Sequence, residues 1–133
     1  MSVVAVARRY ADALADVASA RNEVKQIDRE VLLFVDMLKS HPELRDVFAS
    51  PIISLADKRR VLDALIDRVR PGQMTINLLR TMLSHYRLQY LDVMHEQFRR
   101  VINERKGLII AEVTTRASLT ARRRRGSRVL SSA

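Results

Sequence analysis

Apolar residues recur every three or four positions along most of the chain, and this spacing places them on one face of an α-helix. The pattern is clearest after Asn22, where Ile27, Val31 and Leu38 repeat opposite charged and amide side chains. Asn is favoured at the start of a helix, because its side chain can accept a hydrogen bond from a free backbone N–H. We therefore predict an amphipathic helix over about residues 24–38, capped at its N-terminus by Asn22.

Helix-breaking residues divide the same periodic pattern into six segments. Pro42 suits the first position of a helix, whereas Pro51 and the Pro71-Gly72 pair interrupt the chain. The six predicted helices span about residues 2–20, 24–38, 42–50, 54–69, 75–86 and 88–105.

Two of these helices carry end signals of their own. Ser54 is followed three residues later by Asp57, which resembles a capping pair at a helix N-terminus. Gly107 lies where the last helix could end in a left-handed conformation. We therefore expect helix boundaries at Ser54 and Gly107.

The character of the sequence changes after Gly107. Residues 108–115, LIIAEVTT, are rich in β-branched side chains and predict a strand, whereas residues 116–133 have neither periodicity nor enough apolar content to pack. The predicted fold is all-α: a six-helix bundle domain at residues 1–105, one β-strand within 106–115, and a disordered Arg-rich tail over 116–133.

The first and fifth predicted helices have more apolar surface than a small bundle core needs. Each combines two apolar stripes, whereas burial against neighbouring helices requires one. Surplus apolar surface on adjacent helices favours a groove for an amphipathic partner helix. The stripes are Val3, Ala7, Tyr10, Leu14 and Val17 with Val6, Ala13 and Ala20 in the first helix, and Ile76, Leu79, Leu83 and Tyr86 with Leu78 and Met82 in the fifth.

Composition adds to this picture without changing it. With 133 residues, 47% of them hydrophobic, the chain can bury one core, and the absence of cysteine excludes disulfides and thiol chemistry.

The apolar runs Val31–Val35 and Leu108–Ala111 are far shorter than the ~20 residues that cross a bilayer. The N-terminus lacks the charge order of a signal peptide. We expect a protein that stays where it is made and does not insert into a membrane.

The net charge of +9 is concentrated in the tail. Six of the 24 basic residues are arginines within residues 116–133, which contain no acid, so the first 115 residues hold 18 basic and 15 acidic side chains. An alternative function is therefore a basic helical module that grips nucleic acid through Arg122–Arg125. No aromatic side chains are interleaved with these arginines and no recognition helix is evident, so we favour a solvated tail and expect no nucleic acid partner.

Residue patterns for catalysis, metal binding or cofactor binding are absent from the sequence. His95-Glu96 lacks the second histidine of a zinc-binding HExxH helix, and the three glycines are too dispersed for a phosphate loop. We interpret His95 as a solvated helical histidine, and the acidic residues, Glu30 among them, as parts of solvated helix faces. We therefore expect no enzyme activity of its own, no metal and no cofactor.

Four stretches of the sequence together form a recognisable pattern: VARRYADALADVA near the N-terminus, FASPIISLADKRRVL at residues 48–62, TINLLRTMLSHYRLQYLDVMHEQF at 75–98, and NERKGLIIAEVTT at 103–115. In their order and spacing they resemble the delta subunits of F-type ATP synthases, whose mitochondrial relative is the oligomycin-sensitivity-conferring protein. The resemblance covers residues 1 to about 115. It implies a non-catalytic stator, or peripheral stalk, subunit that links the catalytic head to the membrane sector at the cytoplasmic face of the bacterial plasma membrane.

The resemblance also implies partners and a binding site. In delta subunits the groove partner is the N-terminal helix of an alpha subunit of the catalytic head, and a second α/β domain engages the b subunits of the stalk. Here the Arg-rich tail takes the place of that domain, so we expect residues 1–133 to bind the head without coupling it to the membrane sector. Tyr86 stands where the family often has glycine. The predicted groove residues are Tyr10, Ala13 and Leu14 on the first helix, with Asn77, Leu78 and Thr81 on the fifth.

Overall fold

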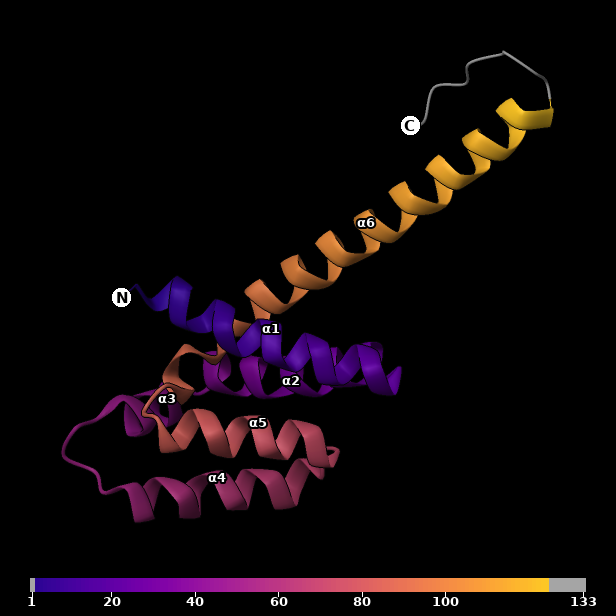
Figure 1. The fold of residues 1–133 in the computed structure, drawn as a ribbon. Coiled ribbons are helices and arrows are strands. Elements are labelled where there is room, and N and C mark those ends of the chain that lie inside the picture. Colours follow the sequence, from indigo (N-terminus) through magenta and orange to yellow (C-terminus); the bar gives the residue numbers. More distant parts are fainter. Residues whose placement is uncertain (1, 125–133) are drawn as a thin grey trace. The chain divides into compact units, whose positions relative to one another are not determined.

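The computed structural model describes the backbone of residues 2–124 and the side chains of residues 2–107. It confirms a mostly helical protein, with six α-helices and one short 3-10 helix among the described residues (Figure 1). The elements are α1 (Val3–Arg21), α2 (Val24–Ser40), α3 (Pro42–Ala49), α4 (Leu55–Val69), α5 (Gln73–Ser84), η1 (Leu88–Tyr90) and α6 (Leu91–Arg124).

The chain divides into two compact units, residues 1–99 and 100–133, with the boundary inside α6. In the first unit α2 contacts α1, α3 and α5, while α4 packs against α5 and α1 also contacts α5 (Figure 1). The predicted domain boundary at residue 105 stays a prediction. The apolar side chains that fill the core of the first unit are Ala7, Ala11, Leu14, Ala15 and Ala18 from α1, Ile27, Val31, Phe34, Val35 and Leu38 from α2, Phe48, Leu62 and Ile66 from α3 and α4, Leu78, Leu79, Met82 and Leu83 from α5, and Leu88, Leu91, Met94 and Phe98 from η1 and α6.

Three helix starts have residues that favour a helix N-terminus. The Ser54 hydroxyl accepts a hydrogen bond from the Asp57 N–H at 3.1 Å, and Ser2 caps α1 in the same way through the Ala5 N–H. Pro42 occupies the first turn of α3, where its missing N–H costs nothing. The predicted starts at Pro42 and Ser54 are therefore confirmed.

Three helix ends have non-glycine residues in the left-handed conformation, at Asn22, Arg70 and Tyr86. Asn22 ends α1 with φ 56°, and the Glu23 N–H bonds the Ala18 carbonyl behind it. The predicted role of Asn22 as the N-terminal cap of α2 is wrong, because α2 begins after Glu23 and has no side-chain cap. Asn tolerates the left-handed region better than most residues, which explains its place at this end.

The predicted strand is not confirmed, because α6 runs through Gly107 and residues 108–115 to Arg124. A helix pairs its backbone groups within one segment, whereas a single strand needs a neighbour that the described residues do not supply. The expected left-handed end at Gly107 is wrong for the same reason. Of the tail predicted as disordered, residues 116–124 are helical, and residues 125–133 lie outside the described residues.

Candidate partner-binding groove

An open groove lies between α1 and α5, with a volume of about 270 Å³. The two helices are in contact, and their side chains line the groove from both sides. The lining residues are Tyr10, Ala13, Leu14 and Val17 from α1, and Met74, Asn77, Leu78 and Thr81 from α5.

All six residues predicted from the sequence lie in this groove. Leu14 and Leu78 form its floor and are 6% and 9% exposed, so each also belongs to the core. Ala13 is exposed at its rim, and Asn77 and Thr81 are exposed on the opposite wall. Tyr10, the sixth, is partly buried. The structure thus brings the predicted residues together, and their role in binding stays a prediction.

Two groove residues were missed from the sequence, Val17 and Met74. Val17 belongs to the same predicted apolar stripe as Tyr10 and Leu14 but was not predicted as a groove residue, yet its side chain is 39% exposed and lines the groove. Met74 precedes the predicted start of its helix, whereas α5 begins at Gln73. Both stand one helical turn from a predicted groove residue, Val17 from Leu14 and Met74 from Leu78, and this spacing is the signal that could have found them.

Two polar groups of the groove are already bonded within α5. The Thr81 hydroxyl donates to the Asn77 carbonyl at 2.7 Å, and the Asn77 side-chain oxygen accepts from Gln73 Nε2 at 2.8 Å. Neither wall presents a histidine, a carboxylate or a lysine to the lumen. The groove is thus suited to burying the apolar surface of a partner.

The N-terminus of α5 is held by a carboxylate from another helix. Glu30 on α2 accepts hydrogen bonds from the Gly72 N–H at 2.9 Å and from the Thr75 hydroxyl at 2.6 Å. Gly72 has no side chain to cap α5, so Glu30 takes that role across the bundle and places a negative charge at the positive end of the helix. The interpretation of Glu30 as part of a solvated face is therefore wrong, and Glu30 positions one wall of the groove.

A second carboxylate joins α2 to the start of α6. His95 Nε2 lies 2.8 Å from Asp28 Oδ1, and the Arg99 guanidinium makes two contacts of 3.2 Å with the same carboxylate. Burial raises the pKa of Asp28, but the hydrogen bonds from Arg99 and His95 outweigh it, so the pKa lies below its ordinary value. His95 is 6% exposed. The interpretation of His95 as solvated is wrong, because the side chain is buried against Asp28. Asp28 lies 67 positions earlier in the sequence, so the local pattern around His95 could not indicate the contact.

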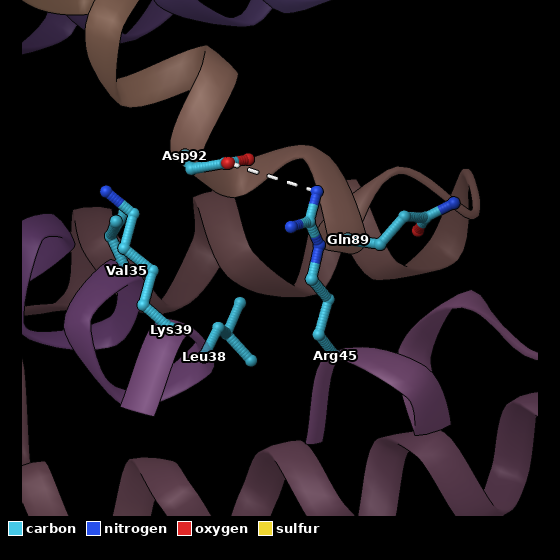
Figure 2. Close-up of a pocket in the computed structure, with 6 residues that line it drawn as sticks. All are labelled: Val35, Leu38, Lys39, Arg45, Gln89 and Asp92. Carbon is cyan, nitrogen blue, oxygen red and sulfur yellow. Dashed lines mark ion pairs between the residues drawn. The ribbon is translucent and has the colours of Figure 1, made fainter. Parts of the chain in front are cut away.

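A small cavity lined from α2, α3, η1 and the start of α6 carries no separate site. Arg45 and Asp92 line it and form an ion pair of 3.9 Å, and Val35 and Leu38 line it from α2 (Figure 2). Its volume of about 10 Å³ is at the lower limit for one water molecule. Among the described residues, no group of three or more His, Asp or Glu side chains could hold a metal ion.

No helix within the described part of the chain is both long and apolar enough to cross a bilayer.

Comparison with known proteins identifies the family. The model of the ATP synthase delta (OSCP) subunit family matches residues 6–126. ATP synthase subunit delta of Magnetococcus marinus is 31% identical over 115 residues, which cover 86% of this chain and 62% of the relative. The same subunit of Koribacter versatilis is 35% identical over 123 residues, covering 92% and 69%, and that of Myxococcus xanthus is 32% identical over 120 residues, covering 89% and 66%.

The chain thus spans about two thirds of the length of these curated relatives. The family match nevertheless extends over both the groove helices and the start of α6. The chain belongs to the ATP synthase delta (OSCP) subunit family.

Proposed function

We propose that this chain is a non-catalytic stator subunit of a proton-translocating F-type ATP synthase, and that its α1/α5 groove binds the N-terminal helix of an alpha subunit of the catalytic head. The observation that carries the proposal is the groove itself, an apolar depression between the two helices whose apolar surface exceeds what the core uses. Family membership supplies the assembly in which such a groove would work.

A helix is the occupant that fits these walls best. The described residues form only helices, so there is no sheet edge on which an extended peptide could add a strand. α5 has 12 residues and is therefore about 18 Å long, which matches roughly three turns of a partner helix. A partner with apolar residues at positions i, i+3 or i+4, and i+7 would cover Val17 and Met74, the two partly exposed apolar side chains that sequence reasoning missed.

The stator role follows from mechanics. A rotor that turns inside the catalytic head drags the head with it unless a static part of the assembly holds the head in place. Binding at the α1/α5 groove would provide the attachment on the head side, at the cytoplasmic face of a bacterial plasma membrane. The structure describes side chains up to residue 107, and we assign none of these side chains a contact with the b subunits of the stalk.

The direct test is binding of the Ala13→Asp variant to purified catalytic head. Ala13 is exposed on the rim of the groove, so a carboxylate there faces solvent in the free protein and meets apolar surface in the complex. We expect at least a tenfold rise in Kd, with the cost to folding limited to the helix propensity of Asp, less than about 0.7 kcal/mol relative to Ala.

The matched control is Ala64→Asp, which makes the same exchange at an exposed alanine within α4, away from the groove. It should bind the head like the unaltered chain. Equal Kd values for a folded Ala13→Asp variant and for the control would remove the groove from the proposed interface. No observation on the described residues favours the alternative nucleic-acid-binding function.

A further inference from the structure

A second cleft lies at the opposite end of α5 from Gly72, beneath the loop that joins α3 to α4. This loop is the outward-bending connection between the two helices in Figure 1. The cleft has a volume of about 490 Å³ and is lined by residues 48–55 together with Lys58, Tyr86 and Gln89; we call it the Lys58 cleft. It shares no lining residue with the α1/α5 groove.

Lys58 is a buried ammonium group without a carboxylate partner. Its residue is 3% exposed, and none of the ion pairs among the described residues includes it. The Lys58 ammonium lies over the Tyr86 ring, whose centroid is 5.5 Å from Lys58 Nζ. A cation–π contact offsets only part of the cost of burying an ammonium group, and lysine is rarely buried unpaired. Lys58 is therefore suited to a carboxylate that comes from outside the chain.

Gln89, a residue that lines both this cleft and the small cavity of Figure 2, has a buried acceptor without a donor. Gln89 Oε1 is the buried side-chain atom that lacks a hydrogen-bond partner among the described residues. Figure 2 shows that the Gln89 amide points away from the Arg45–Asp92 ion pair, so that pair does not satisfy it. An unmet buried acceptor costs about 1–3 kcal/mol, which a backbone N–H of a bound peptide would recover.

The rim of the Lys58 cleft adds an apolar anchor. Ile52 is 92% exposed, next to Pro51 in the α3–α4 loop, and is the most exposed of the large hydrophobic side chains in the first unit. Exposed apolar surface beside a charged or hydrogen-bonding group is typical of a peptide-binding surface. The occupant therefore needs an apolar side chain as well as a carboxylate, and a small inorganic anion offers neither the apolar contact nor the backbone donor.

We propose that the Lys58 cleft binds an acidic segment of a partner protein, with one carboxylate on the Lys58 ammonium, an adjacent apolar side chain on Ile52 and a backbone N–H on Gln89 Oε1. Charge complementarity at the cleft supports an acidic partner, because Lys58 is the one charged residue among those that line it, and it is a cation. The proposal concerns a surface separate from the groove, so either can fail without the other.

The test is an NMR titration of the isotopically labelled full chain with the pentapeptide acetyl-Ala-Leu-Asp-Leu-Ala-amide. We expect saturable shifts in the backbone amide signals of residues 48–55 and 86–89. The matched peptide with Asn in place of Asp should bind at least fivefold more weakly. Lys58→Met, which keeps the apolar stem of the side chain, should weaken binding of the Asp peptide at least tenfold, whereas Lys25→Met, at an exposed lysine of α2, should not.

If Lys58→Met does not fold, Ile52→Ser takes its place, because a side chain 92% exposed contributes little to folding. We then expect at least a threefold loss of affinity. The proposal is overturned by unchanged affinity in either folded variant, by equal binding of the Asn peptide, or by shifts confined to other residues. Inorganic phosphate that produces the same shifts with equal affinity would replace the peptide site by a small-anion site and would also overturn it.

Discussion

Removing the Glu30 carboxylate should destabilise the domain far more than its place on a helix surface suggests. In Glu30→Ala the Thr75 hydroxyl, in a residue that is 0% exposed, loses its acceptor, and the Gly72 N–H loses its cap. An unmet buried hydroxyl costs about 1–3 kcal/mol, and a lost helix cap about 1 kcal/mol. We expect a loss of about 2–4 kcal/mol, a large part of the 5–15 kcal/mol typical of a folded domain.

Urea denaturation followed by circular dichroism at 222 nm measures this loss, and thermal unfolding should show a Tm lowered by roughly 10–20 °C. A double-mutant cycle with Thr75→Val separates the pairwise contact from other effects. Removing both partners leaves no orphaned hydroxyl, so the double variant should be more stable than the sum of the single losses predicts, by about 1 kcal/mol. Additive losses in the cycle would refute the reasoning. A Glu30→Ala variant whose free energy of unfolding lies within about 0.5 kcal/mol of that of the unaltered chain would also refute it, because ordinary surface substitutions stay within this range.

The same variant also links stability to the groove. Gly72 and Thr75 belong to the first turn of α5, next to Met74 and Asn77 on the groove wall. A frayed first turn would displace those two side chains, so Glu30→Ala should weaken head binding although Glu30 does not line the groove.

Three further predictions concern other parts of the chain. Asp28→Asn should lower the free energy of unfolding by about 1 kcal/mol at pH 7, and this difference from the unaltered chain should close below about pH 4. Because the pKa of Asp28 is lowered in the folded state, the stability that its carboxylate contributes is present above the unfolded pKa and is lost as pH falls through the folded value. Urea denaturation at a series of pH values would detect the loss. Arg70→Gly should raise stability by about 0.5–1 kcal/mol, because Arg70 has φ 51° at the end of α4, where glycine is unstrained, and a lower Tm would contradict this. Residues 1–107 should fold cooperatively without metal or nucleotide and bind the catalytic head with the Kd of the full chain, a result that circular dichroism and a pull-down with purified head would test.

The helices could be predicted from the sequence wherever one stripe was apolar and the rest polar. α2 has one such stripe, and the predicted buried residues Ile27, Val31 and Leu38 lie in the core. α1 is apolar over much of its surface, so periodicity could not choose its buried face. The face that packs consists largely of alanines, among them Ala11 and Ala15, because small side chains let neighbouring helices approach closely.

What could not be predicted depends on contacts between distant positions. Glu30 and its partner Gly72 are 42 residues apart, and local polarity alone indicates solvent for such a side chain. The strand at residues 108–115 was predicted from its β-branched side chains. Such residues favour a strand only where a neighbouring strand is present to pair with it. The groove residues were predicted because surplus apolar surface and family resemblance pointed to the same two helices.

The walls of the groove stand far apart along the chain, since α1 ends at Arg21 and α5 begins at Gln73. The groove therefore exists only while the helices between them are folded, and a partner that occupies it binds the native state alone. At a concentration 100 times its Kd, such a partner adds about 2.7 kcal/mol to the free energy of unfolding. A proteolysis assay should then show the same chain surviving longer on the catalytic head than free in solution, so that unassembled copies are removed first.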